Sequence, residues 1–213
     1  MNRRPLPPRS DTIPSRLEQL AHALETPLDP TIRLQLVQWI ETILHWNQKI
    51  DLTAARTIDE LLDLCVADAI VLSRSIEANR RVVDVGSGAG APGLPLALLR
   101  PDLTVTLVEP LAKRVAFLRT VAGSLPTTVS IQRTHGENLP HHGWDVAISR
   151  ATLEPSAWLA MGLHLVDSKG KVAVLLARQE ISPPIDAVSE EDISYRWPLT
   201  QAQRRVRWFK RGR

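Results

Sequence analysis

Apolar residues recur at helical spacing in the first third of the chain and give way to short apolar runs from Val82 onward. Spacings of three and four residues predict an amphipathic helix over 32–47. A second helix is predicted over 57–76, where Thr57 can cap the first turn and Glu60 can complete a capping box. From Val82 the apolar runs alternate with helical segments, a pattern typical of a parallel sheet built from strand–helix–strand units.

The last two predicted strands differ from those before them. The helical signal fades beyond residue 176 and Pro183-Pro184 interrupts it, which predicts an antiparallel pair closing a parallel sheet. Basic and apolar residues alternate in the final strand, which predicts an edge strand with one solvent-facing side. The predicted strands cover residues 82–85, 104–109, 129–134, 145–150, 171–176, about 193–197 and 204–210.

These elements predict an α/β fold: a Rossmann-like, mostly parallel seven-stranded sheet with helices on both faces and a helical N-terminal extension. Residues 1–14 are rich in proline and lack periodicity, so we expect a flexible arm there. The extension is expected over 15–78 and the Rossmann-like domain over 79–213. Asp68 falls near the apolar stripe of the second helix, where a buried carboxylate bonded to backbone or solvent is expected.

A glycine-rich turn after the first predicted strand carries the clearest chemical signal in the chain. Gly86, Gly88 and Gly90 follow the strand directly, and a helix is predicted just beyond them. Glycine lets a ligand approach the main chain closely, and a helix start offers unpaired N–H groups. Glu109 ends the next apolar run about 20 positions later, the spacing at which a carboxylate reaches a ribose hydroxyl pair. The sequence therefore predicts a nucleotide-like cofactor at this turn.

The identity of that cofactor follows from the residues around the turn. The spacing of Gly86, Gly88 and Ala91 also satisfies the dinucleotide fingerprint, so NAD is a candidate. Asp84, just before the first glycine, would repel a pyrophosphate but could attract the ammonium group of a methionine moiety. No basic residue lies near the turn in sequence to meet phosphates. These features favour S-adenosylmethionine, which contains a ribose and an adenine but no phosphate.

Charge and composition indicate which partners and which cellular compartment to expect. The net charge is only +3, yet basic residues cluster at 204–213 and in the N-terminal arm, which is typical of an RNA-binding surface; a solvated tail is the alternative. The single cysteine, Cys65, excludes an internal disulfide and is compatible with the cytoplasm. No apolar run is long enough to span a membrane. We expect a cytoplasmic monomer that does not bind membranes.

Several catalytic patterns are missing. The sequence holds no HExxH motif, no GxSxG elbow and no GxxxxGK[ST] loop, and one cysteine cannot build a thiolate zinc site, so no metal site is expected. After the fourth strand, where amino-directed methyltransferases carry an Asn/Asp-Pro-Pro-aromatic signature, the chain reads Ile148-Ser149-Arg150-Ala151. We expect no catalytic general base. Guanine N7 has a free lone pair and no proton, so its methylation depends on alignment rather than on proton removal.

Several motifs together resemble one known family. They are Leu52-Thr53-Ala54, the glycine turn continued by Pro92-Gly93-Leu94-Pro95-Leu96, Lys113-Arg114 with Phe117-Leu118-Arg119, and Ser149-Arg150-Ala151. Over residues 30–180 the chain resembles the glucose-inhibited division protein B family. These proteins are bacterial class I methyltransferases that make 7-methylguanosine in 16S ribosomal RNA of the small subunit from S-adenosylmethionine.

The resemblance also implies roles for single residues. Gly86 and the backbone at Ala91 would contact the methionine portion of the cofactor, and Glu109 would hold its ribose. Gly136 and Glu137 would bracket the adenine. Arg150 would line the pocket shared by cofactor and substrate.

The chain departs from the family pattern at Asp51, Cys65, Ala91, His135 and Ala177. Because some of these positions would lie near the substrate, a diverged methyltransferase acting on another RNA or a small molecule is the alternative. A non-catalytic RNA-binding module and an oxidoreductase are more distant alternatives.

Overall fold

The computed structural model describes residues 6–7, 9–150, 153–177, 180–181 and 183–212. It contains a seven-stranded sheet in the order β3-β2-β1-β4-β5-β7-β6. Strands β1 to β5 pair in parallel, whereas β7 is antiparallel to both β5 and β6, which confirms the predicted closing pair. The strands are β1 (Arg81–Val85), β2 (Thr104–Val108), β3 (Ser130–Gln132), β4 (Trp144–Ser149), β5 (Val166–Leu176), β6 (Ala187–Arg196) and β7 (Gln203–Arg211).

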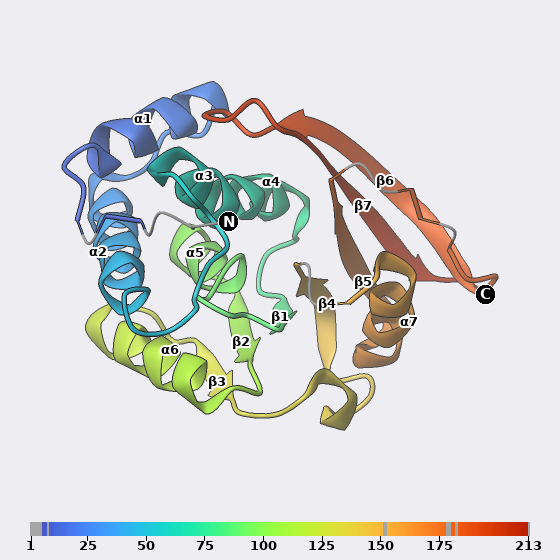
Figure 1. Cartoon of the computed structure of the whole chain (residues 1–213). Helices are drawn as coiled ribbons and strands as arrows, with labels where there is room; N and C mark the ends of the chain where they lie inside the picture. The colour runs from blue at the N-terminus through green and yellow to red at the C-terminus, as the bar shows by residue number, and fades with distance from the viewer. Residues whose placement is uncertain (1–5, 8, 151–152, 178–179, 182, 213) are drawn as a thin grey trace, which may run out of the picture.

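Helices cover both faces of the sheet, as predicted, but unequally (Figure 1). Successive side chains of a strand point to opposite faces, so Val82 of β1 joins one hydrophobic core and Val83 the other. The first core is covered by α1 (Ile13–Ala23), α2 (Pro30–Trp46), α3 (Ile58–Leu62), α4 (Asp68–Ser75), α5 (Gly93–Leu99) and α6 (Ala112–Ser124). The second core is covered by α7 (Pro155–Leu165).

The N-terminal extension shares a continuous core with the Rossmann-like part. Trp39 of α2 is fully buried, and its indole Nε1 donates a hydrogen bond to the Ala89 carbonyl at 3.0 Å. Ala89 belongs to the glycine turn, so the extension directly supports that turn. Ile13 and Pro14, which the sequence places in the arm, belong to α1, and Leu6 is buried in the same core.

The helix predicted over 57–76 is present, with a π-helical turn, η1 (Asp63–Ala67), inside it. Thr57 caps its start by accepting a hydrogen bond from the Glu60 N–H at 3.1 Å, while the Glu60 carboxylate accepts from the Arg56 N–H at 2.6 Å. The buried Asp63 carboxylate accepts hydrogen bonds from the N–H groups of Leu199 and Thr200, at 3.2 and 2.8 Å. This turn therefore anchors the connection between β6 and β7.

Replacing Asp63 by alanine is expected to lower the free energy of unfolding by about 2 kcal/mol, because two backbone donors lose their acceptor. Urea unfolding of the full chain measures the change. Asp59→Ala is the matched control on the same helix. Asp59 forms a partly exposed ion pair with Arg16, so its replacement should cost about 1 kcal/mol or less. Equal losses in the two variants would contradict this role of Asp63.

The prediction that the last strand lies at the sheet edge is wrong. Strand β7 lies between β5 and β6, and β6 is the edge strand. Basic residues of β7 form ion pairs with acidic residues on β6: Arg205 and Arg207 pair with Asp192, and Lys210 pairs with Glu190. Charge alternation on β7 thus reflects pairing with a charged neighbour strand.

Candidate functional site

The glycine turn connects β1 to α5 and lies against the end of β2. Gly86, Gly88 and Gly90 all have positive φ, at 74°, 56° and 98°, a conformation that side chains with a Cβ rarely adopt. The N–H groups of Gly86 and Ser87 donate to the Val108 carbonyl at 2.8 and 3.1 Å. The turn is therefore fixed to the strand that carries Glu109 at its end.

Asp84 stabilises this turn from beneath. Its side chain is fully buried, and Oδ2 accepts a hydrogen bond from the Gly93 N–H, the first residue of α5, at 3.0 Å. Burial raises the pKa of the Asp84 carboxyl to about 6. Asp84 does not line the cavity above the turn, and its carboxylate binds the start of α5 instead.

Asp84→Asn is expected to remove part of the pH dependence of stability. Because the pKa is raised to about 6 in the folded chain, the folded state holds the proton more tightly than the unfolded state does. The contribution of Asp84 to the free energy of unfolding is therefore greatest below the pKa that this group has in the unfolded chain. It is lost as the pH rises through about 6, a change of about 2–3 kcal/mol. Urea unfolding between about pH 4 and pH 7 should show this decline in the parent chain and not in Asp84→Asn. An equal decline in the parent chain and in Asp84→Asn would contradict this role of Asp84.

Glu109 lies against the glycine turn, as the sequence spacing predicts for a strand–helix–strand unit. It is 2% exposed, and its Oε2 accepts from the Gly88 N–H at 3.0 Å while Oε1 accepts from the Leu111 N–H at 2.9 Å. Each carboxylate oxygen has a second lone pair that can accept a hydroxyl. The geometry suits a carboxylate that binds adjacent hydroxyl groups.

A cavity of about 540 Å³ opens over the turn. It is lined by five of the seven residues predicted to bind the cofactor. Its size falls in the usual range of small-molecule sites, about 300–1,000 Å³. Its lining is both polar and apolar, as a nucleoside requires. It combines backbone groups of the turn and the Glu109 carboxylate with the apolar Pro110 and Leu111. The five residues are Gly86, Gly88, Ala91, Glu109 and Arg150.

The expectation that no basic residue lies near the turn is wrong. Arg114 and Arg150 both line the cavity, because the fold brings α6 and the end of β4 to it. The Arg114 Nη1 atom lies 4.0 Å from Glu109 Oε2, and Arg150 donates to the Leu64 carbonyl. The absence of nearby cations in the sequence therefore does not exclude a phosphate-bearing cofactor.

Gly136 and Glu137 lie apart from this cavity. They begin the short 3-10 helix η2 (Gly136–Asn138) and line a smaller hollow of about 230 Å³ with Met161 and His164. A Cβ at Gly136 would lie 2.8 Å from Val85 Cγ1, so this residue packs beside the end of β1. The structure thus brings the pair close to the strand that leads into the turn but not into the same cavity.

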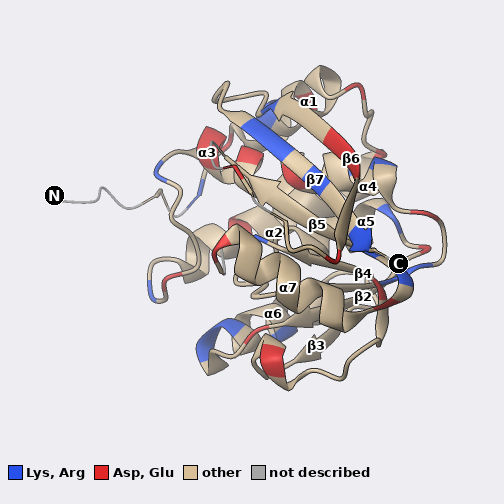
Figure 2. Cartoon of the chain, turned by 90° about the vertical axis from the view of Figure 1, so that its right-hand side faces the viewer, with Lys and Arg blue, Asp and Glu red and all other residues tan. Residues whose placement is uncertain are grey.

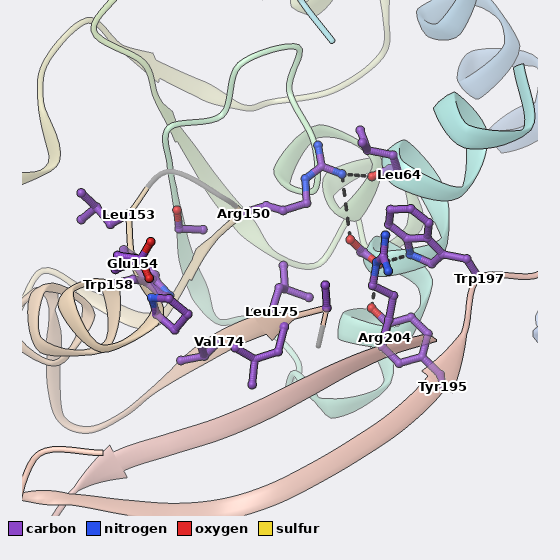
Figure 3. Close-up of a pocket in the computed structure, with 15 residues that line it drawn as sticks. Leu64, Arg150, Leu153, Glu154, Trp158, Val174, Leu175, Tyr195, Trp197 and Arg204 are labelled. Carbon is purple, nitrogen blue, oxygen red and sulfur yellow. Dashed lines mark hydrogen bonds and ion pairs between the residues drawn. The ribbon is translucent and has the colours of Figure 1, made fainter. Parts of the chain in front are cut away.

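A second cavity, of about 520 Å³, adjoins the first (Figure 3). Leu64 and Arg150 line both cavities, so they form the boundary between them. The second cavity is walled by Trp158 and by Tyr195, Trp197 and Arg204 of the β6–β7 hairpin. The sequence prediction includes Arg204 only as part of the basic cluster and does not include the two aromatic residues. An aromatic pair beside a basic strand is the local signal that could have drawn attention to this hairpin.

Asp68 connects the walls of the second cavity. It is buried, as expected, but its partners are side chains rather than backbone or solvent. Oδ1 accepts from the Tyr195 hydroxyl at 2.6 Å and from the Trp197 indole at 2.7 Å, and Oδ2 lies 3.9 Å from Arg150 Nη1. Tyr195 and Trp197 are more than a hundred residues from Asp68 in sequence, and Arg150 follows the end of β4. The carboxylate therefore holds three elements together.

Two titratable groups near the cavities, the Cys65 thiol and the Tyr195 phenol, are held neutral. Burial raises the pKa of the Cys65 thiol to about 12, so the thiol is protonated at neutral pH. Burial, together with the adjacent Asp68, also raises the pKa of the Tyr195 phenol. Neither group is suited to act as a general base at neutral pH. Within the described residues, no group of three or more His, Cys, Asp or Glu side chains could hold a metal ion.

The basic C-terminal cluster is mostly neutralised. Blue segments on β7 lie beside red segments on β6 in Figure 2, and Arg205 also pairs with Glu180 at 3.1 Å. Arg211 donates to the Leu163 carbonyl at 2.7 Å. Arg204 is different, because it faces the second cavity. Arg213, Arg3 and Arg4 lie outside the described residues, as does Ala151 of the Ser-Arg-Ala motif.

The strand order, the glycine turn and the carboxylate at the end of β2 define a class I methyltransferase fold. Solved structures agree: a 1,6-didemethyltoxoflavin-N1-methyltransferase from Burkholderia thailandensis superposes with a TM-score of 0.57 at 12% identity, covering 88% of this chain and 93% of that one. A TehB-like SAM-dependent methyltransferase from Corynebacterium glutamicum gives a TM-score of 0.52 at 11% identity, covering 68% and 88%. At these identities the similarity shows the fold alone.

Sequence comparison identifies the family. Residues 32–184 match the model of the family described as GidB: rRNA small subunit methyltransferase G. A protein named ribosomal RNA small subunit methyltransferase G from Anaeromyxobacter dehalogenans (strain 2CP-C) is 32% identical over 91% of this chain and 97% of its own. One of the same name from Psychromonas ingrahamii is 34% identical over 83% and 88%. The chain belongs to this family, and its cofactor is S-adenosylmethionine.

Among the described residues, no helix is both long and apolar enough to cross a membrane.

Proposed function

We propose that this protein methylates N7 of a guanine in ribosomal RNA of the small subunit. The observation that carries the proposal is the boundary between the two cavities. Of the described residues, only Leu64 and Arg150 line both, and neither side chain can accept a proton at neutral pH. An exocyclic amine or a hydroxyl must lose a proton on methylation, whereas N7 has none to lose.

The cofactor supplies a methyl group on a sulfonium centre when bound. The turn residues Gly86, Gly88 and Ala91 would hold its methionine portion through their main chain, and Glu109 would accept from its ribose hydroxyls. For the adenine we propose Gly136 and Glu137. The residues of the chain then contribute binding and alignment, which can supply a large part of the rate acceleration of a group transfer.

Arg150 has the position of an orienting group in this reaction. Its guanidinium donates to the Leu64 carbonyl and lies 3.9 Å from Asp68, so both its charge and its position are fixed at the boundary. A fixed guanidinium can donate to the O6 atom of guanine, which lies beside N7. The same group would exclude water from the boundary between donor and acceptor.

The family names support a ribosomal RNA substrate, and small-subunit RNA is therefore the substrate to test. Purified full chain should transfer labelled methyl groups from S-adenosylmethionine to small ribosomal subunits taken from cells that lack the protein. Subunits from cells that contain the protein are the control and should accept little label. Absence of transfer to both would contradict the proposal.

A small-molecule acceptor is the alternative within the same fold. An RNA substrate is bound partly through its phosphates, so its apparent affinity should fall steeply as the salt concentration rises. Affinity that does not respond to salt would favour the small molecule. We further propose that the enzyme is a monomer and acts in the cytoplasm, where the ribosomal subunits are.

A further inference from the structure

The second cavity contains a planar cation fixed on an aromatic ring. Arg204 Cζ lies 3.5 Å from the centroid of the Trp197 ring, a distance that is possible only over the face of the ring. Trp197 is 7% exposed, and its indole is tied to Asp68. Arg204 itself is only half-buried and lines the cavity. The guanidinium is therefore a supported plane on the cavity wall.

The Arg204 guanidinium and the Trp197 ring beneath it are connected to the boundary with the cofactor cavity. The Asp68 carboxylate binds Trp197 through Oδ1 and faces Arg150 through Oδ2. Asp68 is 2% exposed, so this connection is shielded from water. The position of Arg204 is thus set relative to Arg150 by buried groups rather than by surface loops.

An acidic side chain lies on the other side of the cavity. Glu154 precedes α7 and is exposed, and Figure 3 shows it across the cavity from Arg204. A carboxylate can accept two hydrogen bonds side by side. Guanine presents such a pair of donors, N1–H and N2–H, on its Watson–Crick edge, and adenine does not.

We propose that this second cavity receives the acceptor guanine, displaced from a single-stranded segment of RNA, with the base stacked on Arg204. Its donor edge meets Glu154, and its N7 edge is turned toward Arg150 and the cofactor cavity. Bases that are modified by enzymes are commonly taken out of their stack into such a pocket, where aromatic or guanidinium planes replace the lost stacking. This inference rests on the proposed function, because it specifies the acceptor site of the same reaction.

The stacking role is tested by separating the plane of Arg204 from its charge. Arg204→Ala removes both, and Arg204→Lys keeps the charge but loses the plane. Lys210→Ala is the control: it removes one positive charge from the same strand, where Lys210 is paired with Glu190 and does not line the cavity. We expect kcat/KM for small-subunit RNA to fall about tenfold or more in both Arg204 variants and less than about twofold in the control.

The affinity for S-adenosylhomocysteine, measured by calorimetry, should be unchanged in all three variants, which shows that the fold and the cofactor site are intact. Full activity in Arg204→Lys would overturn the stacking role. So would an equal loss in Arg204→Ala and Lys210→Ala, because the effect would then be one of general charge.

A binding measurement distinguishes failure of the pocket from failure of the proposed function. Saturation-transfer NMR with guanosine 5′-monophosphate, in the presence of S-adenosylhomocysteine, should detect binding to the parent chain and lose it in Arg204→Ala. Binding that depends on Arg204 without methyl transfer to RNA would support the pocket and contradict the function. Methyl transfer that is unchanged in Arg204→Ala, with nucleotide binding also unchanged, would overturn the pocket alone.

The same measurement tests the role of Glu154. The parent chain should prefer guanosine 5′-monophosphate to adenosine 5′-monophosphate, and Glu154→Gln should reduce this preference about tenfold, because one of the two acceptors becomes a donor. An unchanged preference in Glu154→Gln would overturn this part of the proposal.

Discussion

Replacing Gly93 by alanine is expected to destabilise the fold by about 3 kcal/mol and to abolish methyl transfer. An added Cβ would lie 2.5 Å from Leu107 Cδ2, 2.7 Å from Asp84 Oδ2 and 2.8 Å from Asp84 Cβ. None of these atoms can move easily, because both side chains are fully buried between β1, β2 and α5. Relief requires α5 to shift away from the sheet, which would break the hydrogen bond between Gly93 and Asp84 and displace the turn.

Gly123→Ala is the matched control. A Cβ at Gly123 would meet nothing within 4 Å, and the residue lies in α6, where alanine is the better helix former by up to about 1 kcal/mol. Urea unfolding should therefore show that Gly93→Ala is less stable than the parent chain and that Gly123→Ala is more stable. A Gly93→Ala protein as stable as Gly123→Ala would show that α5 is not packed as described.

Glu109→Gln is expected to weaken the binding of S-adenosylhomocysteine about 100-fold. The carboxylate is buried, accepts the Gly88 and Leu111 N–H groups, and in our account also accepts the ribose hydroxyls. Each hydrogen bond to a charged acceptor contributes about 1.5–3 kcal/mol, and a 100-fold loss of affinity corresponds to about 2.7 kcal/mol. Titration calorimetry with the full chain measures the affinity.

Glu77→Gln provides the comparison for this experiment. Glu77 is an exposed carboxylate that pairs with Arg80 outside the cavity, and its replacement should leave the affinity unchanged. Thermal unfolding of Glu109→Gln without ligand separates a loss of affinity from a loss of folded protein. Parent-like affinity in Glu109→Gln would remove this residue from the cofactor site.

The part of the site that the sequence predicts best is contiguous along the chain. The turn at Gly86 and the carboxylate at Glu109 belong to one strand–helix–strand unit, whose geometry follows from local spacing alone. Thr57 with Glu60 is a similar case, since a helix start requires only neighbouring residues. The order of the first five strands also follows a common rule for such units, and the observed sheet agrees with it.

What the sequence does not show depends on contacts between distant segments. Asp68 meets Tyr195 and Trp197, and nothing in the residues around Asp68 indicates which strand will supply its partners. The basic residues of β7 look like an exposed RNA-binding stripe until β6 brings Asp192 and Glu190 beside them. Pairing with a neighbouring strand thus changes the meaning of a charge pattern, and only the three-dimensional structure identifies that neighbour.

The identity of the methylated nucleoside shows whether N7 of guanine is the acceptor atom. Small-subunit RNA methylated in vitro by the purified full chain is digested to nucleosides and analysed by mass spectrometry. Because neither Leu64 nor Arg150, the described residues that line both cavities, can take a proton from the acceptor, the proposal predicts 7-methylguanosine as the product. A product methylated on an exocyclic amine, such as N2-methylguanosine or N6-methyladenosine, would contradict the account.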